Sequence, residues 1–119
     1  MVDSALVVDD DAAFLALAVR ILDELGVPAV LTAGDAASGL REATAGRPAA
    51  VLVDVDLPDR DGIDLSAELA RLPWAPVVIL TSTDRDAGRA VAARDGAGPP
   101  FIPKEELAGE TLRRLLSEG

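Results

Sequence analysis

Short apolar runs and helically spaced apolar residues alternate along the chain. The short runs, which are typical of buried strands, lie at residues 5–8, 29–31, 50–53, 77–80 and 101–102. Apolar residues that recur every three or four positions, with flanking capping and stop residues, predict helices over residues 14–25, 35–46, 63–72, 84–95 and 107–116. The pattern therefore predicts five strands and five helices in strict alternation.

This alternation points to the α/β class. Right-handed crossovers carry each helix back over the sheet, so we expect a doubly wound five-stranded parallel sheet with helices on both faces. The run at 77–80 is apolar at every position, as a strand covered on both faces would be. With 119 residues the chain has the length of one domain, and we expect a single domain over residues 1–119.

Polar residues stand at the ends of four of the five predicted strands. Asp9 and Asp10 follow the first strand, Asp54 ends the third, Thr81 ends the fourth, and the fifth leads into Lys104. The carboxyl ends of parallel strands share one edge of the sheet, and ligands of such folds bind beyond that edge. We therefore expect these five side chains to lie close together.

The carboxylates among them suggest a metal. Three carboxylates in one cleft repel one another, and one of them takes up a proton unless a cation offsets the charge. Mg2+ prefers oxygen ligands, typically one or two carboxylates completed by waters and phosphate oxygens, and Asp9, Asp10 and Asp54 suit such an ion. The chain has no histidine or cysteine that could recruit zinc. The expected cofactor is therefore Mg2+.

Lys104 is the only lysine among eleven basic residues. Its compact ammonium suits a point contact to a carboxylate or phosphoryl oxygen. Several of these residues also have a purely structural explanation. Asp10 or Asp11 could cap the first helix, Thr81 could be an ordinary strand-end hydroxyl, and Lys104 could be a surface cation. The convergence of all of them at one edge favours a functional site.

The charge of the chain excludes some partners. Acidic residues outnumber basic ones by 21 to 11, which leaves a net charge of −10. Such a charge repels phosphate backbones and anionic headgroups, so we expect no direct nucleic-acid binding and no membrane binding. The apolar runs fall far short of the roughly 20 residues that a membrane span needs. The N-terminus lacks a secretory pattern and cysteine is absent, so the expected location is cytoplasmic.

Four segments with this chemistry resemble the receiver domain of two-component response regulators. They occur in the order that this family shows, together with Asp61 and Gly62, and they comprise residues 7–10, 53–58, 80–82 and 101–104. The resemblance covers essentially the whole chain. It implies a flavodoxin-like fold and a single receiver domain that accepts a phosphoryl group and is not an enzyme.

The resemblance also implies roles for individual residues. Asp54 matches the phosphoacceptor, which takes a phosphoryl group from a sensor histidine kinase or a phosphotransfer protein. Asp9 and Asp10 match the Mg2+ ligands, which are joined by Asp54 itself and by the backbone carbonyl of Asp56. The implied reaction therefore depends on Mg2+.

Three further residues match groups that respond to the phosphoryl group. Thr81 matches the hydroxyl that contacts it, Lys104 matches its ion-pair partner, and Phe101 matches the switch aromatic. The implied readout is a change around the fourth helix and the fifth strand, recognised by a downstream protein that the sequence does not name. Glu105 and Glu106 follow Lys104 where the family commonly has proline, and this extra acid is expected to weaken the Lys104 contact. Whether the chain is a monomer or a dimer is left open.

Two other functions fit some of the same residues. Asp54 and Asp56 also resemble the nucleophile motif of haloacid-dehalogenase-type phosphatases. The paired acids of that family follow the motif, however, whereas Asp9 and Asp10 precede it. The second alternative is a degenerate receiver that never accepts phosphate and acts only as a protein-docking module.

Overall fold

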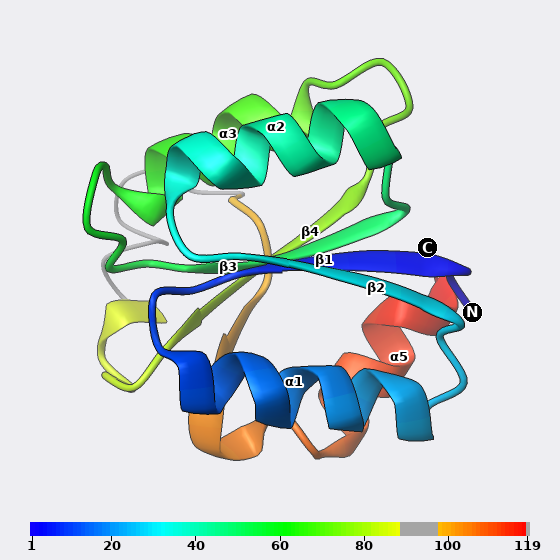
Figure 1. The fold of residues 1–119 in the computed structure, drawn as a ribbon. Helices are drawn as coiled ribbons and strands as arrows, with labels where there is room; N and C mark the ends of the chain where they lie inside the picture. The colour runs from blue at the N-terminus through cyan, green and yellow to red at the C-terminus, as the bar shows by residue number, and fades with distance from the viewer. Residues whose placement is uncertain (89–97, 119) are drawn as a thin grey trace.

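The computed structural model describes residues 1–88 and 98–118 of the chain. Five strands form one sheet in the order β2-β1-β3-β4-β5, and every neighbouring pair is parallel (Figure 1). Their bounds are Ser4–Val8 (β1), Ala29–Ala33 (β2), Ala50–Asp54 (β3), Val77–Ser82 (β4) and Phe101–Pro103 (β5). The expected doubly wound, flavodoxin-like sheet is confirmed, and the chain order reverses between β1 and β3.

Helices cover both faces of this sheet (Figure 1). Helices α2 and α3 lie on one face, and α1 and α5 lie on the other. Their bounds are Ala12–Glu24 (α1), Ala36–Gly46 (α2), Gly62–Ala70 (α3) and Glu110–Glu118 (α5). The helix expected over residues 84–95 lies largely outside the described residues. Among the described helices, none is long and apolar enough to cross a membrane.

The last helix begins later than its apolar spacing predicts. We expected it to start at Leu107, but a short 3-10 helix over Lys104–Glu106 comes first and α5 starts at Glu110. Gly109 lies between the 3-10 helix and α5, and its N–H donates to the Glu106 carbonyl at 3.0 Å in a tight turn. Glycine is a poor residue for a helix interior, so the chain turns there and starts the helix anew.

Two apolar layers fill the space between the sheet and its helices. Neighbouring residues of a strand point to opposite faces. In β1, Ala5 and Val7 face α1 and α5, whereas Leu6 and Val8 face α2 and α3, and all four are buried. Because both faces of the central strands are dry, polar side chains gather beyond the strand ends.

Three helices begin at the carboxyl edge of the sheet, and each is preceded by an aspartate that serves as its N-cap. Asp11, Asp35 and Asp61 cap α1, α2 and α3 by accepting hydrogen bonds from backbone N–H groups of the first turn. Asp11, and not Asp10, is the cap of the first helix. Asp10 is thereby left at the sheet edge, where the positive ends of the helix dipoles also lie.

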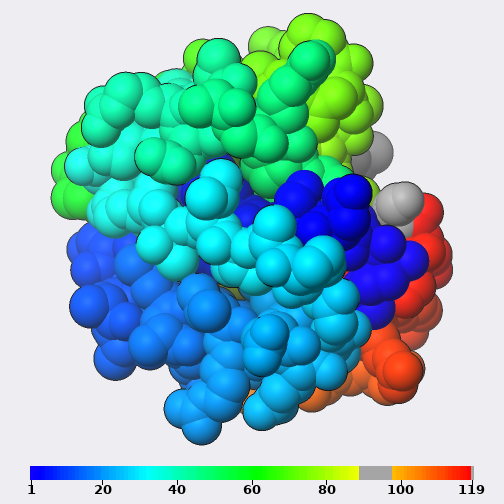
Figure 2. Space-filling view, turned by 45° about the vertical axis from the view of Figure 1, so that its right-hand side comes forward, coloured from blue at the N-terminus to red at the C-terminus, as the bar shows by residue number. Residues whose placement is uncertain are grey.

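The strand β2 closes one side of the sheet. In the space-filling view its residues lie at the surface between α1 and α2 (Figure 2). Ala33 is the only residue of β2 that is buried. The cluster of polar residues lies at the carboxyl end of the buried strands β1, β3 and β4 and not along this exposed strand.

Candidate functional site

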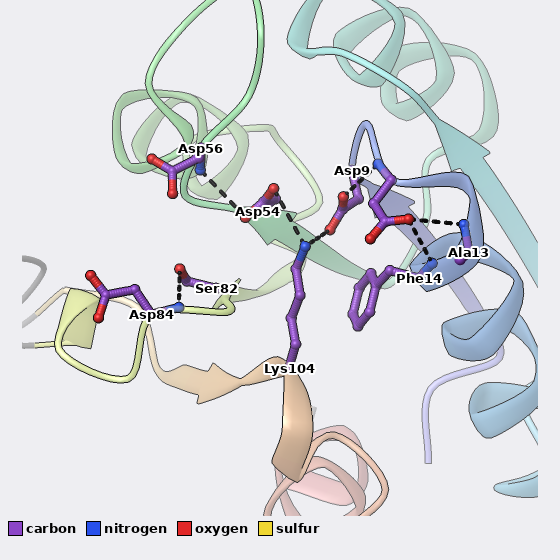
Figure 3. A network of polar contacts seen from close by, with 9 residues as sticks. Asp9, Ala13, Phe14, Asp54, Asp56, Ser82, Asp84 and Lys104 are labelled. Atoms are coloured by element: carbon purple, nitrogen blue, oxygen red, sulfur yellow. Dashed lines mark hydrogen bonds and ion pairs between the residues drawn. The ribbon is translucent and has the colours of Figure 1, made fainter.

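The carboxyl ends of β1, β3, β4 and β5 meet at one edge of the sheet (Figure 3). In the register of the sheet, Asp54 lies beside Thr81. Val8, which precedes Asp9, lies beside Val53, which precedes Asp54. Asp9 and Asp54 therefore leave neighbouring strands at the same height.

Asp9, Asp10 and Asp54 form a compact group, here called the acid triad. Each contributes one carboxylate oxygen, and these oxygens all lie within 4.8 Å of one another. Asp9 and Asp54 are buried, whereas Asp10 is exposed. The acid triad is therefore closed on the side of the sheet and reaches solvent beside Asp10.

Lys104 approaches the acid triad from the end of β5 (Figure 3). Its Nζ lies 2.7 Å from Asp9 Oδ2 and 3.6 Å from Asp54 Oδ2. The same atom lies 4.6 Å from the centre of the Phe14 ring. Only 11% of the Lys104 side chain is exposed. The ammonium is therefore held between two carboxylates and the face of an aromatic ring.

The two oxygens of Asp9 have different partners. Oδ1 accepts a hydrogen bond from the Asp11 N–H at 2.9 Å. Oδ2 is buried and accepts no aligned hydrogen bond from the described residues, although Lys104 Nζ lies 2.7 Å away as an ion-pair partner. A buried carboxylate oxygen without an aligned donor is costly. A divalent cation would satisfy it, so the acid triad fits an ion that prefers oxygen ligands.

The charges at this edge are not balanced. Burial raises the pKa of Asp54 to about 6, the negative charge of Asp9 adds to this effect, and Lys104 opposes it. Burial by itself lowers the pKa of Lys104, but the contact with Asp9 and the charge of Asp54 outweigh burial and hold that pKa above its usual value. Lys104 is therefore charged at neutral pH, and its single charge offsets only part of the negative charge of the acid triad.

The β3–α3 loop, residues 55–61, forms one wall of the site. Asp56 and Asp61 pair across its base as an antiparallel bridge. The Asp56 N–H donates to Asp54 Oδ1 at 3.4 Å (Figure 3). A cleft of about 260 Å³ lies between this loop and Asp10. The open side of the acid triad therefore continues into this cleft.

Residues 5–116 match the family model of the response regulator receiver domain. The chain belongs to this family. The match covers almost the whole sequence, and it agrees with the sheet order and with the acid triad at the carboxyl edge. The resemblance carried by the strand-end motifs is confirmed.

Two curated proteins illustrate the relatives of this receiver domain. The transcriptional regulatory protein PdtaR of Mycobacterium tuberculosis is 33% identical over 121 residues, which cover 94% of this chain and 59% of that protein. The protein-glutamate methylesterase/protein-glutamine glutaminase of Alkalilimnicola ehrlichii is 33% identical over 122 residues, which cover 96% of this chain and 31% of that protein. The receiver domain thus spans less than two thirds of the length of these relatives.

A solved structure has the same fold. The CheY-like response regulator receiver domain protein of Methanospirillum hungatei JF-1 superposes with a TM-score of 0.81 at 24% identity. The alignment covers 99% of this chain and 96% of that one. At this identity the likeness shows the receiver fold and carries no information on partners.

The structure brings most of the residues predicted for the receiver site together. Asp9, Asp10 and Asp54 lie close together, and Lys104 pairs with Asp9 and Asp54. Thr81 is buried on β4 and lies beside Asp54 in the register.

Phe101 is partly buried at the start of β5 and packs against the layer under α2 and α3. A Cβ atom built on Gly88 would lie 2.9 Å from its ring. A larger residue at position 88 would therefore require the Phe101 ring to shift.

Glu105 and Glu106 both pair with Arg85, which lies in the segment after β4. Arg85 Nη1 contacts Glu105 Oε1, and Arg85 Nη2 lies 2.7 Å from Glu106 Oε2. The two glutamates after Lys104 are thus paired with Arg85, and Lys104 lies 2.7 Å from Asp9.

Phe14 is a site residue that the sequence pattern did not identify. Its apolar spacing marks it as a core residue of α1, and it is indeed buried. Its contact with Lys104 could have been predicted from its position three residues after the cap Asp11. The first turn of a helix that starts at the carboxyl edge faces the site. Its ring shields the Lys104 ammonium from solvent on one side.

Proposed function

We propose that this receiver domain accepts a phosphoryl group on Asp54 from a phosphohistidine of a sensor histidine kinase or a phosphotransfer protein, in a reaction that depends on Mg2+. The acid triad is the observation that supports this most directly. It places a buried carboxylate at the end of a central strand, beside two further carboxylates and 3.6 Å from a lysine ammonium. Such a carboxylate can act as a nucleophile towards a charged phosphorus centre.

In the proposed step, a carboxylate oxygen of Asp54 attacks the phosphorus in line with the leaving group. An O–P bond forms, the P–N bond of the phosphohistidine breaks, and the imidazole leaves with the electron pair of that bond. Lys104 lies close enough to pair with a phosphoryl oxygen after little movement. Positioning and electrostatic stabilisation would supply most of the rate.

The metal ligands in this proposal are Asp9, Asp10, Asp54 and the backbone carbonyl of Asp56. When bound, Mg2+ supplies positive charge that offsets the charge of the phosphoryl oxygens. Asp9 is held by the Asp11 N–H and by Lys104, so its carboxylate is oriented before any ligand arrives. Asp10 is exposed and leaves one side of the site open to the donor.

Thr81 and Phe101 are the proposed response elements. A phosphoryl group on Asp54 brings roughly 1.5 to 2 negative charges. These charges would draw the Thr81 hydroxyl inwards and let the Phe101 ring turn into the space that it vacates. A downstream protein would then bind the face around β5 and residues 84–95, most of which lie outside the described residues. We propose that this phosphoryl transfer takes place in the cytoplasm.

Intact-mass measurement after incubation with Mg2+ and acetyl phosphate tests the proposal. We expect about one phosphoryl group per chain on the wild type and none on Asp54→Asn or on the wild type in excess chelator, because each condition removes the nucleophile or the cation. Asp23→Asn is the matched control, since Asp23 is an exposed residue of α1 and should leave the adduct unchanged.

Two other results would point elsewhere. Repeated turnover of unrelated phosphomonoesters would favour a haloacid-dehalogenase-type phosphatase. A wild type that forms no adduct with any small donor, while remaining folded, would favour a receiver that acts only as a docking module.

A further inference from the structure

The β3–α3 loop is tied to a helix that lies more than twenty residues earlier in the chain. Asp59, near the tip of the loop, accepts a hydrogen bond from the Ala36 N–H on Oδ1 at 2.8 Å. Its Oδ2 accepts a second one from the Ala37 N–H at 3.0 Å. The hydrogen bond from Ala36 is the main reason that the pKa of Asp59 is held below its usual value. One carboxylate thus joins the tip of the loop to the first two residues of α2.

Helix α2 already has a cap of its own. Asp35 Oδ1 accepts a hydrogen bond from the Ser38 N–H at 2.7 Å. Asp59 therefore adds partners for the Ala36 and Ala37 N–H groups but is not the residue that starts the helix. What Asp59 adds beyond capping is a fixed position for the loop that carries it.

The base of the same loop is held by backbone contacts. Gly62 N–H donates to the Val55 carbonyl at 2.9 Å, and Asp56 pairs with Asp61. The tip lies beyond these contacts, where Asp59 reaches the helix. Since Asp56 belongs to this loop and its N–H contacts Asp54 Oδ1, a shift of the tip would be passed to the wall of the acid triad.

We propose that Asp59 is a positioning residue for the cation site: by fastening the β3–α3 loop to α2, it holds in place the backbone of Asp56, whose carbonyl would be one of the cation ligands. This inference rests on the proposed Mg2+ site. Mg2+ demands near-ideal octahedral geometry, so small displacements of one ligand weaken binding. Groups that orient a ligand without touching the metal commonly change metal affinity by 10- to 100-fold.

The test compares Asp59→Ala with Asp35→Ala. Both substitutions remove an aspartate that caps α2, and both should lower the melting temperature, but only Asp59 belongs to the loop beside the acid triad. Mg2+ affinity is measured by isothermal titration calorimetry on the metal-free protein, and Mn2+ binding by the loss of the free-ion EPR signal. We expect about 10-fold weaker binding of both ions by Asp59→Ala and a change of less than about 2-fold for Asp35→Ala.

Asp59→Asn provides a graded variant, because an amide oxygen can keep one of the two hydrogen bonds. Its affinity for Mg2+ and Mn2+ should fall between those of the wild type and Asp59→Ala. This variant can be measured in place of Asp59→Ala if the alanine variant does not fold. Equal losses in the Asp59 and Asp35 variants, or no loss in either, would overturn the inference while leaving the cation site intact. A wild type that binds neither ion would overturn the proposed site and this inference together.

Discussion

Asp9, Asp54 and Lys104 form an almost dry cluster in which negative charge exceeds positive charge. Asp9 is fully buried and Asp54 is 5% exposed. Buried charges are tolerated when each has a close partner of opposite sign. Lys104 makes its closer contact with Asp9 (2.7 Å) and a longer one with Asp54 (3.6 Å). Asp54 therefore carries most of the imbalance, and burial raises its pKa to about 6.

This imbalance predicts that Asp54→Asn stabilises the metal-free protein at neutral pH. The pKa of Asp54 is higher in the folded state (about 6) than its ordinary value of 3.8. The stability that protonated Asp54 contributes is therefore fully present below about pH 4 and is lost as the pH rises through about 6. We expect the gain of the variant in unfolding free energy to be larger at about pH 7.5 than at about pH 5, by on the order of 1 kcal/mol.

Urea unfolding in chelator at the two pH values measures this difference. Asp23→Asn changes an exposed carboxylate and should give the same small effect at both. Added Mg2+ should reduce the gain of Asp54→Asn, because a cation stabilises the ionised carboxylate of the wild type. A gain that is independent of pH would mean that the Asp54 carboxyl does not titrate above its ordinary range.

The sequence predicts the residues of the acid triad and Lys104 better than their surroundings. Asp9, Asp54 and Lys104 could be placed at one edge because strands in a parallel sheet end together, which requires only the order of elements. The pairing of Arg85 with Glu105 could not be predicted, because both side chains are exposed and belong to segments whose path is set by tertiary structure. Contacts between loop side chains depend on geometry that periodicity does not encode.

At the scale of elements, α3 begins directly against β3, the strand that ends in Asp54. A Cβ atom built on Gly62, the first residue of α3, would lie 1.9 Å from the carbonyl oxygen of Asp54. The Gly62 N–H also donates to the Val55 carbonyl at 2.9 Å. Only glycine fits at this junction, so the site and the helix depend on the same close approach of two backbones.

Gly62→Ala should therefore destabilise the protein, on the order of 3 kcal/mol, because a methyl group overpacks a contact between backbone segments that have little room to move. Urea unfolding provides the measurement. Gly34→Ala is the matched control, since a Cβ built on Gly34 meets no atom within 4 Å, and it should change the unfolding free energy by less than about 0.5 kcal/mol. A Gly62→Ala protein of wild-type stability would show that α3 can shift away from β3 freely.

The elements differ in how well the sequence predicts their bounds. Asp35 and Gly46 mark the two ends of α2 in the sequence as they do in the structure. The apolar spacing predicts too early a start for the closing helix, because Leu107 fits the apolar period of a helix although it lies in the turn before α5. Leu107 is buried in the layer under α1 and α5, so burial and helical spacing coincide there without a helix.

At the scale of the whole molecule, the surplus of acid creates a field around the site. The net charge is −10, and several further acids lie near the acid triad in the loops of the carboxyl edge. Such a field attracts cations and repels anions over distances of about 10 Å at moderate salt. The sequence predicts its sign, whereas its concentration at one edge follows from the parallel sheet, which brings strand ends and helix caps together.

Because the proposed reaction needs a cation and an anionic donor, salt should act on its two parts in opposite directions. Raising NaCl from about 50 mM to about 500 mM should weaken Mg2+ binding several-fold, since screening removes the attraction. At saturating Mg2+, the same change should raise the rate constant for phosphorylation by acetyl phosphate, since screening also removes the repulsion of this anion. Calorimetry and time-resolved intact mass provide the two measurements, and potassium glutamate at equal ionic strength controls for chloride. If salt lowered both quantities, the donor would be limited by local contacts at the site and not by the net charge of the molecule.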